Sequence, residues 1–145
     1  MQSAAEHITA FLLGFFLYTA LEIAGRGYTH WTMALTGGIA LALLYHMEAT
    51  LTASRLTKAA LGACFVTAME FAVGVVDNLI MGWAVWDYSE IRTNLLGQIC
   101  LPFSALWFVL CLLASLLCMG LYRRFHPCAS GKAVRHARFI RVLSK

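Results

Sequence analysis

Four long apolar runs, separated by short polar segments, dominate the pattern along the chain and predict four membrane-spanning helices. The runs cover residues 8–25, 30–49, 58–83 and 98–122, and a helix needs about 20 apolar residues to cross a bilayer. None of them alternates apolar and polar positions as a barrel strand does, and within lipid only helices and closed barrels satisfy the backbone. We therefore expect an all-α membrane protein in which residues 1–122 form a four-helix bundle and residues 123–145 form a tail.

The composition agrees with a membrane location. Of the 145 residues, 61% are hydrophobic and 12% are charged, whereas soluble proteins average about 25% charged residues. A soluble protein and a large domain outside the membrane are both excluded, so we expect a multi-pass protein of the cell membrane with the lipid bilayer as a partner. The five cysteines are an odd number without a CxxC pair, so no disulfide framework, metal site or cofactor is expected.

Lys and Arg residues predict the orientation of the bundle. The two loops that join the first to the second run and the third to the fourth hold only Arg26 and Arg92. Because cytoplasmic segments carry the excess of Lys and Arg, we expect both termini in the cytoplasm and residues 83–97 outside. The tail has no acidic residue, which favours anionic lipid as its partner over nucleic acid, for which no motif is present. The cations on the expected cytoplasmic side are Arg55, Lys58, Arg123, Arg124, Lys132, Arg135, Arg138, Arg141 and Lys145.

Two carboxylates lie seven residues apart inside the third run. Glu70 and Asp77 interrupt an otherwise apolar segment, where a charged side chain costs about 3 kcal/mol at the bilayer centre and generally faces protein or water. Together with Glu22, near the outer end of the first helix, they are the candidate residues of a substrate or ion pathway.

A structural interpretation of these carboxylates stays open beside the functional one. Glu22 has Arg26 at i+4 as an ion-pair partner. The other two would be protonated, or hydrogen-bonded to hydroxyl groups or a Trp indole. His46 and Glu48 are expected at the inner membrane interface, with side chains that extend toward water.

Small and polar residues recur at helical spacing on the third and fourth runs. Alternating intervals of four and three residues place them on one face of each helix. We call these two faces the seam and expect them to pack closely, as small residues do in membranes. The expected packing residues are Gly37, Gly38, Gly74 and Trp107, and the seam comprises Ala63, Thr67, Glu70, Gly74 and Asp77 on the third run and Ser104, Trp107, Cys111, Ser115 and Cys118 on the fourth.

The segment WAVWDYSEIRTNLLGQICLP, which begins at Trp83, is rich in aromatic and turn-forming residues. Singly they suit an aromatic belt, an N-cap and turns. As a group we expect them to form a cap or re-entrant element over the seam, because irregular backbone near membrane depth requires burial in protein. The expected cap residues are Trp86, Asp87, Tyr88, Ser89, Asn94 and Gln98.

Three strings of the sequence resemble one bacterial family, the CmpB-like family of type IV ABC-transporter permeases. They are HWTMALTGG at 30–38, MEFAVGVVDNLIMGWAVWDYS at 69–89 and NLLGQICLPFSALW at 94–107. The resemblance extends over residues 8–115 and implies a small multi-helix membrane protein with a transport role. The chain departs from the family pattern at Asp77, where members usually carry Asn or another residue, and at 91–93, where a common proline is absent.

The residues and the resemblance favour a transporter or permease subunit that moves a small polar or cationic solute past the carboxylates. Four helices enclose little volume, so we expect a homo-oligomer or a partner membrane subunit. The alternative is a non-transporting interaction or assembly subunit in which the seam only packs helices together. No HExxH or nucleophile-elbow motif is present, and no enzymatic activity is expected.

Overall fold

Helices make up most of the computed structural model of the chain, which describes residues 3–127. All four apolar runs form helices: α1 (Ala4–Arg26), α2 (Trp31–Thr50), α3 (Arg55–Gly74) and α4 (Leu101–Phe125). A π-helical turn, η1 (Val75–Ile80), continues α3, and β1 (Asn94–Leu95) and β2 (Ile99–Cys100) form a small antiparallel hairpin before α4. The expected all-α class is confirmed, whereas the expectation for most of the basic tail lies outside the described residues.

Local sequence signals fix several helix ends. Ser3 caps α1 in a capping box with Glu6, in which each side chain satisfies a backbone N–H group of the other. Gly27 ends α1 in the left-handed region with φ of 82°, a conformation in which glycine has no steric penalty. Ser54 caps α3, and Pro102 stands in the first turn of α4, where its missing N–H group costs nothing.

Three helical segments within residues 3–127 are long and apolar enough to cross a membrane: Ala4–Arg26, Arg55–Ile80 and Leu101–Phe125. The remaining helix, α2, is not among these segments, and it carries Thr, Gly, His and Glu residues among its apolar ones. It contacts each of the three other helices and buries eight residues, including Leu41 and Tyr45. Because protein surrounds α2 on several sides, it needs less apolar surface than a helix that faces lipid, and its expected crossing of the membrane stays a prediction.

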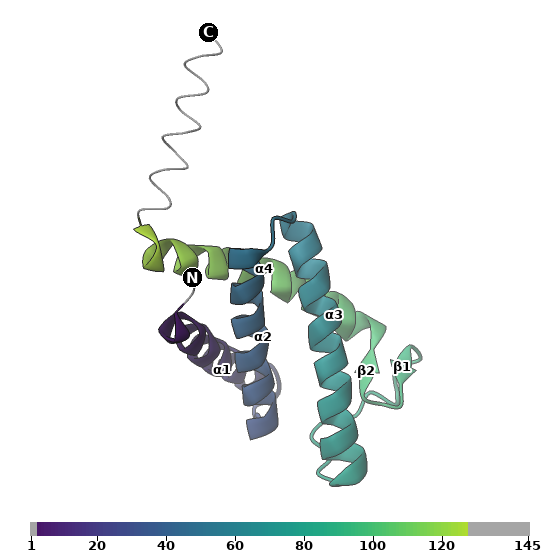
Figure 1. Cartoon of the computed structure of the whole chain (residues 1–145). Coiled ribbons are helices and arrows are strands. Elements are labelled where there is room, and N and C mark those ends of the chain that lie inside the picture. Colours follow the sequence, from purple (N-terminus) through teal and green to yellow (C-terminus); the bar gives the residue numbers. More distant parts are fainter. Residues whose placement is uncertain (1–2, 128–145) are drawn as a thin grey trace.

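The helices run back and forth, so that the bundle has two distinct ends. At the first, which we call the termini end, Arg55 at the start of α3 lies 3.6 Å from Met119 of α4. His126, just after α4, lies 3.0 Å from Glu6 of α1. At the opposite end, which we call the loop end, the α1–α2 connection and residues 81–100 meet. Figure 1 shows α4 crossing α2 and α3 obliquely, and the β1–β2 hairpin beside α3.

Close packing between α1 and α2 depends on two glycines. A Cβ atom at Gly14 would lie 2.5 Å from the carbonyl oxygen of Gly37, and a Cβ at Gly37 would lie 2.3 Å from the Cβ of Tyr18. No side chain fits at these separations, so the helices approach at the distance that only glycine permits. Gly38 receives the ring of Phe11 in the same way, and the sequence had identified Gly37 and Gly38 as packing residues.

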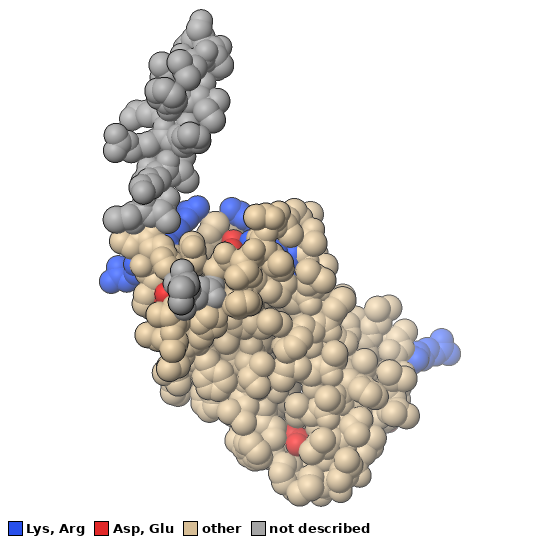
Figure 2. All heavy atoms as spheres, viewed as in Figure 1, with Lys and Arg blue, Asp and Glu red and all other residues tan. Residues whose placement is uncertain are grey.

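Charged side chains are sparse on the face shown in Figure 2. Lys and Arg side chains gather at the termini end, and the surface between the two ends is almost free of charge. Many exposed side chains of the helices are apolar, such as those of Leu12, Phe16 and Leu113. An apolar surface of this kind matches the hydrocarbon layer of a membrane.

Candidate functional site

Glu70 lies at the centre of the contact between α3 and α4. Only 2% of the residue is exposed, and the indole Nε1 of Trp107 donates a hydrogen bond of 2.8 Å to its Oε2 atom. The hydroxyl of Tyr88, which comes from the segment after η1, donates to the Oε1 atom at 3.2 Å. Both donors are neutral, and no Lys, Arg or His of residues 3–127 forms an ion pair with this carboxylate.

Asp77 is also buried, with 1% of the residue exposed, and its partners come from the start of α2. The hydroxyl of Thr32 donates to its Oδ2 atom at 2.5 Å. The Nδ1 atom of His30 lies 2.7 Å from the same hydroxyl and 3.8 Å from the carboxylate. The side chain of His30 is partly exposed, so the hydroxyl of Thr32 can relay a proton between the loop end and Asp77.

The π-helical turn separates the surroundings of the two carboxylates. In a continuous α-helix seven residues make nearly two full turns, and Asp77 would stack above Glu70 against the same neighbours. The wider turn begins at Val75, and Asp77 is bonded to α2 whereas Glu70 is bonded to α4. Turns of this kind are frequent at functional sites, and the residue pattern alone gave no sign of one.

Glu22, the third carboxylate of the expected pathway, lies near the end of α1. The hydroxyl of Tyr18 donates to it at 3.1 Å and that of Thr29 at 2.6 Å. Arg26 forms the i+4 ion pair that the sequence offered, at 2.9 Å, and its second terminal nitrogen donates to the carbonyl of Val85 at 3.0 Å. Arg26 therefore compensates the charge of Glu22 and also holds residues 81–100 against α1.

Residues 81–100 fold back along the last turns of α3. Asn78 holds them through two bonds: its amide donates to Gln98 Oε1 at 2.8 Å, and its Oδ1 accepts from the backbone N–H of Val85 at 2.7 Å. Trp86 donates its indole N–H to the carbonyl of Gln98 at 2.9 Å. Gly74 makes room for this contact, because a Cβ there would lie 2.6 Å from Gln98 Oε1 and 2.9 Å from the ring of Trp86.

Residues 85–98 of this segment, which we call the cap, are also held by bonds among themselves. Asp87 accepts from the backbone and hydroxyl of Ser89, and Asn94 bonds the backbone of Ile91 and Gly97. Burial, together with the nearby Glu70 carboxylate, raises the pKa of Tyr88 above its ordinary value, so at neutral pH its hydroxyl stays protonated and can donate. Of the six expected cap residues, Trp86, Tyr88 and Gln98 face the bundle, whereas Asp87, Ser89 and Asn94 shape the turns.

Asn78→Leu is expected to detach the cap from α3. The substitution removes both bonds and leaves Gln98 and the backbone N–H of Val85 without these partners, at about 1–3 kcal/mol for each buried group. Trypsin should then cut the purified protein faster at Arg92, the exposed basic residue of this segment. The neighbouring Leu79→Ala, at an exposed position, is the control. Equal cleavage rates in Asn78→Leu and the wild type would contradict this role of Asn78.

Polar contacts at the termini end were not expected. Glu48 does not extend toward water: Lys58 forms an ion pair with it at 3.2 Å, and the hydroxyl of Ser115 lies at 3.3 Å. Glu6 is buried and accepts hydrogen bonds from Tyr45 and His126. The sequence pattern missed both sites because each joins residues from different helices.

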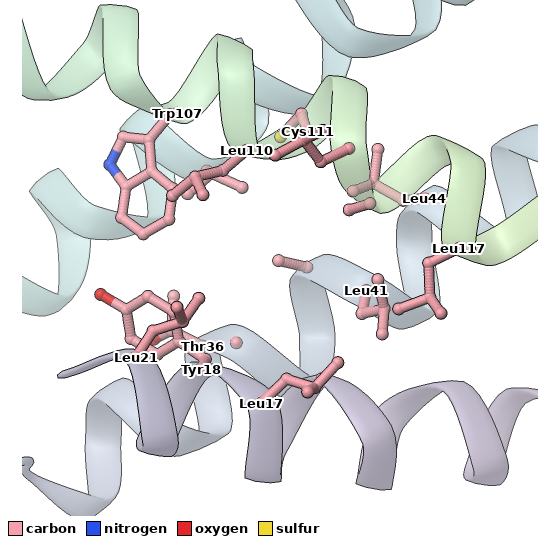
Figure 3. A pocket seen from close by; sticks show the side chains of 16 residues that line it. Leu17, Tyr18, Leu21, Thr36, Leu41, Leu44, Trp107, Leu110, Cys111 and Leu117 are labelled. Atoms are coloured by element: carbon pink, nitrogen blue, oxygen red, sulfur yellow. The ribbon is translucent and has the colours of Figure 1, made fainter. Parts of the chain in front are cut away.

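An apolar groove of about 340 Å³ runs between α1, α2 and α4. Leu41 of α2 forms part of its floor, and the exposed side chains of Leu17 on α1 and Leu113 on α4 line its rim. Tyr18 and Trp107 stand together at one end, with ring centres 5.5 Å apart, and leucines fill the other end (Figure 3). These two residues are also the donors to Glu22 and Glu70, so the groove ends directly in front of two carboxylates.

Comparison with models of protein families gives a match. The model of a family described as "Putative ABC-transporter type IV" matches residues 15–142. Neither the curated proteins nor the solved structures contain a match.

Proposed function

The chain belongs to this ABC-transporter type IV family, and we propose that it is a membrane subunit of a transport system. In this proposal a small polar or cationic solute moves past Glu22, Glu70 and Asp77. Three helices that could cross a membrane support the membrane location, and the family supports the relation to transport. The further assignment to the cell membrane rests on the charge distribution along the sequence.

The observation that carries the proposal is the carboxylate of Glu70, which is buried and, within the part of the chain that the structure describes, is bonded only to the neutral donors Trp107 and Tyr88. A buried negative charge without a compensating cation is unfavourable. Binding a proton or a cationic solute relieves this cost, and release restores it. Such a carboxylate can bind a cation and then release it. A carboxylate that is already neutralised in an ion pair is less suited to this role.

The relay from His30 through Thr32 to Asp77 supports the same proposal at the loop end. An imidazole ring can both donate and accept a proton, and His30 lies partly exposed beside the hydroxyl that bonds Asp77. Solute movement coupled to protons would begin with proton exchange at this point. No GxxxxGK[ST] signature occurs in the 145 residues, so an ATPase that drives the system would lie outside them.

The proposed topology has four spans and cytoplasmic termini. It is supported by Lys and Arg side chains at the termini end, where α2 ends and α3 begins (Figure 2), and by the contact of Arg55 with Met119. Trypsin added outside sealed, right-side-out vesicles tests it through Arg92, which should be cut while Arg123 is protected. The bundle is small, and the proposal includes a second copy or another membrane subunit as partner.

Glu70→Gln is expected to lower flux at least tenfold in proteoliposomes. The amide has almost the shape of the carboxylate but cannot hold a negative charge, so binding of a cation or proton is lost while the position stays filled. The assay follows uptake of radiolabelled tetramethylammonium and proton entry with an enclosed pH dye, both down an imposed gradient. Glu90→Gln, at an exposed carboxylate of the loop, is the matched control, and equal flux in wild type and Glu70→Gln would refute the proposal.

A second candidate function, an assembly subunit without transport, is favoured by one observation. Glu22 has a hydrogen-bond donor from the α1–α2 connection, and Glu70 and Asp77 have donors from other helices, as residues that hold helices together should. Under this alternative Glu70→Gln lowers the yield of folded protein or its association with partners, and the wild type shows no flux. Loss of flux in an intact, folded variant would exclude the alternative.

A further inference from the structure

We propose that the apolar groove between α1, α2 and α4 binds an amphipathic cation, a compound with an ammonium group on an apolar body. The inference rests on the proposed transport function and names the class of solute. It depends on three features of the groove: its lining, the direction in which it opens, and the charge behind its aromatic end.

The lining fits the apolar body of such a compound. The groove measures about 340 Å³ and is walled almost entirely by aliphatic and aromatic side chains, which is typical of pockets that bind small organic molecules. Gly14 and Gly37, where α1 and α2 are in direct contact, also line the groove and add no side chain to it. A hydrated inorganic ion gains nothing from these walls, whereas an alkyl or aryl chain makes van der Waals contacts with them.

The groove opens sideways rather than at an end of the bundle. Leu17 and Leu21 on α1 and Leu113 and Leu117 on α4 line the groove and are exposed, and α1 and α4 make few contacts with each other. α1 and α4 are both among the candidate membrane spans, so the opening faces hydrocarbon when they cross the bilayer. A compound that partitions into the membrane can therefore enter directly from lipid.

The aromatic end gives the groove its preference for positive charge. Tyr18 and Trp107 close this end (Figure 3), and aromatic faces attract a cation that lies within about 6 Å. Behind them stand the carboxylates of Glu22 and Glu70, to which these same side chains donate. Arg26 neutralises Glu22, but within residues 3–127 Glu70 has only neutral donors, so its ionised carboxylate attracts a cation and repels an anion.

Binding of octyltrimethylammonium to the full chain in zwitterionic nanodiscs tests the inference. The competitor is 2,2-dimethyldecane, its carbon isostere, which has the same shape without the charge. We expect the isostere to compete at least tenfold more weakly than the unlabelled cation against the radiolabelled cation in the wild type, and we expect a much smaller difference in Glu70→Gln, where only the aromatic faces still attract the charge. If 2,2-dimethyldecane and octyltrimethylammonium compete equally well in the wild type, the proposal is overturned and the groove is a site for neutral lipid chains.

The place of binding is tested by filling the groove. Ala114→Phe, on the groove wall, should lower affinity for octyltrimethylammonium at least tenfold. Ala105→Phe, at an exposed position of the same helix outside the groove, should change it less than twofold. Leu117→Trp narrows the groove from its exposed rim and serves if Ala114→Phe does not fold. If a folded Ala114→Phe or Leu117→Trp variant binds octyltrimethylammonium as tightly as the wild type does, the proposal is overturned.

The two proposals can fail separately. If the cation binds as described but flux does not depend on Glu70, the transport function fails and the groove remains a binding site. If Glu70-dependent flux of tetramethylammonium persists while octyltrimethylammonium shows no preference over its isostere, only the inference about the groove fails.

Discussion

Gly37→Val is expected to lower the free energy of unfolding by about 3 kcal/mol or more, because overpacking a close contact typically costs 1–3 kcal/mol and here even the first added carbon does not fit. That carbon would lie 2.3 Å from the Cβ of Tyr18. The Cβ is fixed to the α1 backbone, so no rotamer change relieves the clash and the two helices must separate. Titration of the purified protein from mild detergent into sodium dodecyl sulfate, followed by circular dichroism, measures the change.

Gly120→Val is the matched control for this prediction. Gly120 lies within α4, and a Cβ there meets no atom within 4 Å. The same substitution should therefore change the free energy of unfolding by less than about 1 kcal/mol, the range of helix propensity. Similar losses in both variants would show that the contact between α1 and α2 does not limit stability.

Lys58→Met is expected to lower the free energy of unfolding by about 3 kcal/mol, the usual cost of removing one partner from a buried ion pair. The side chains of Lys58 and Glu48 are 8% and 13% exposed, and their charged atoms lie 3.2 Å apart. Removing the ammonium group leaves the Glu48 carboxylate buried, and within residues 3–127 the Ser115 hydroxyl is its remaining side-chain donor. The same detergent titration reports the loss.

The double variant Glu48→Met/Lys58→Met separates the unpaired charge from simple loss of packing. Replacing both partners by apolar residues of similar size is often neutral, so the double variant should regain most of the stability lost in Lys58→Met. A double variant as unstable as the sum of the two single variants would show that the two side chains act independently and that the ion pair contributes little.

The sequence anticipated the buried side of α3 well. Glu70, Gly74 and Asp77 repeat at helical spacing, and all three are buried. The expected partnership between an indole and a buried carboxylate is present as the bond from Trp107 to Glu70. Such features follow from helix periodicity, which places residues three and four apart on one face whatever the rest of the chain does. The family assignment is also confirmed, by the match over residues 15–142.

Contacts between residues distant in the sequence were beyond the reach of periodicity. Nothing in the pattern pairs Lys58 with Glu48, or Glu6 with Tyr45 and His126. Lys58 had a local interpretation as a cytoplasmic cation, and Glu48 had one as an interfacial carboxylate. These contacts depend on how the helices cross, and many crossing geometries are compatible with the same apolar faces.

The sequence by itself determined the helices, their approximate ends and the membrane class, because apolar runs of this length leave the backbone few other ways to satisfy its hydrogen bonds in lipid. It also determined that glycines would set close helix contacts. Only the tertiary structure decided that a π-helical turn directs Asp77 to Thr32 and leaves Glu70 with Trp107 and Tyr88. The same packing leaves an open groove between α1 and α4, and the physical reason is that a crossing angle depends on all the helices at once, not on any one segment.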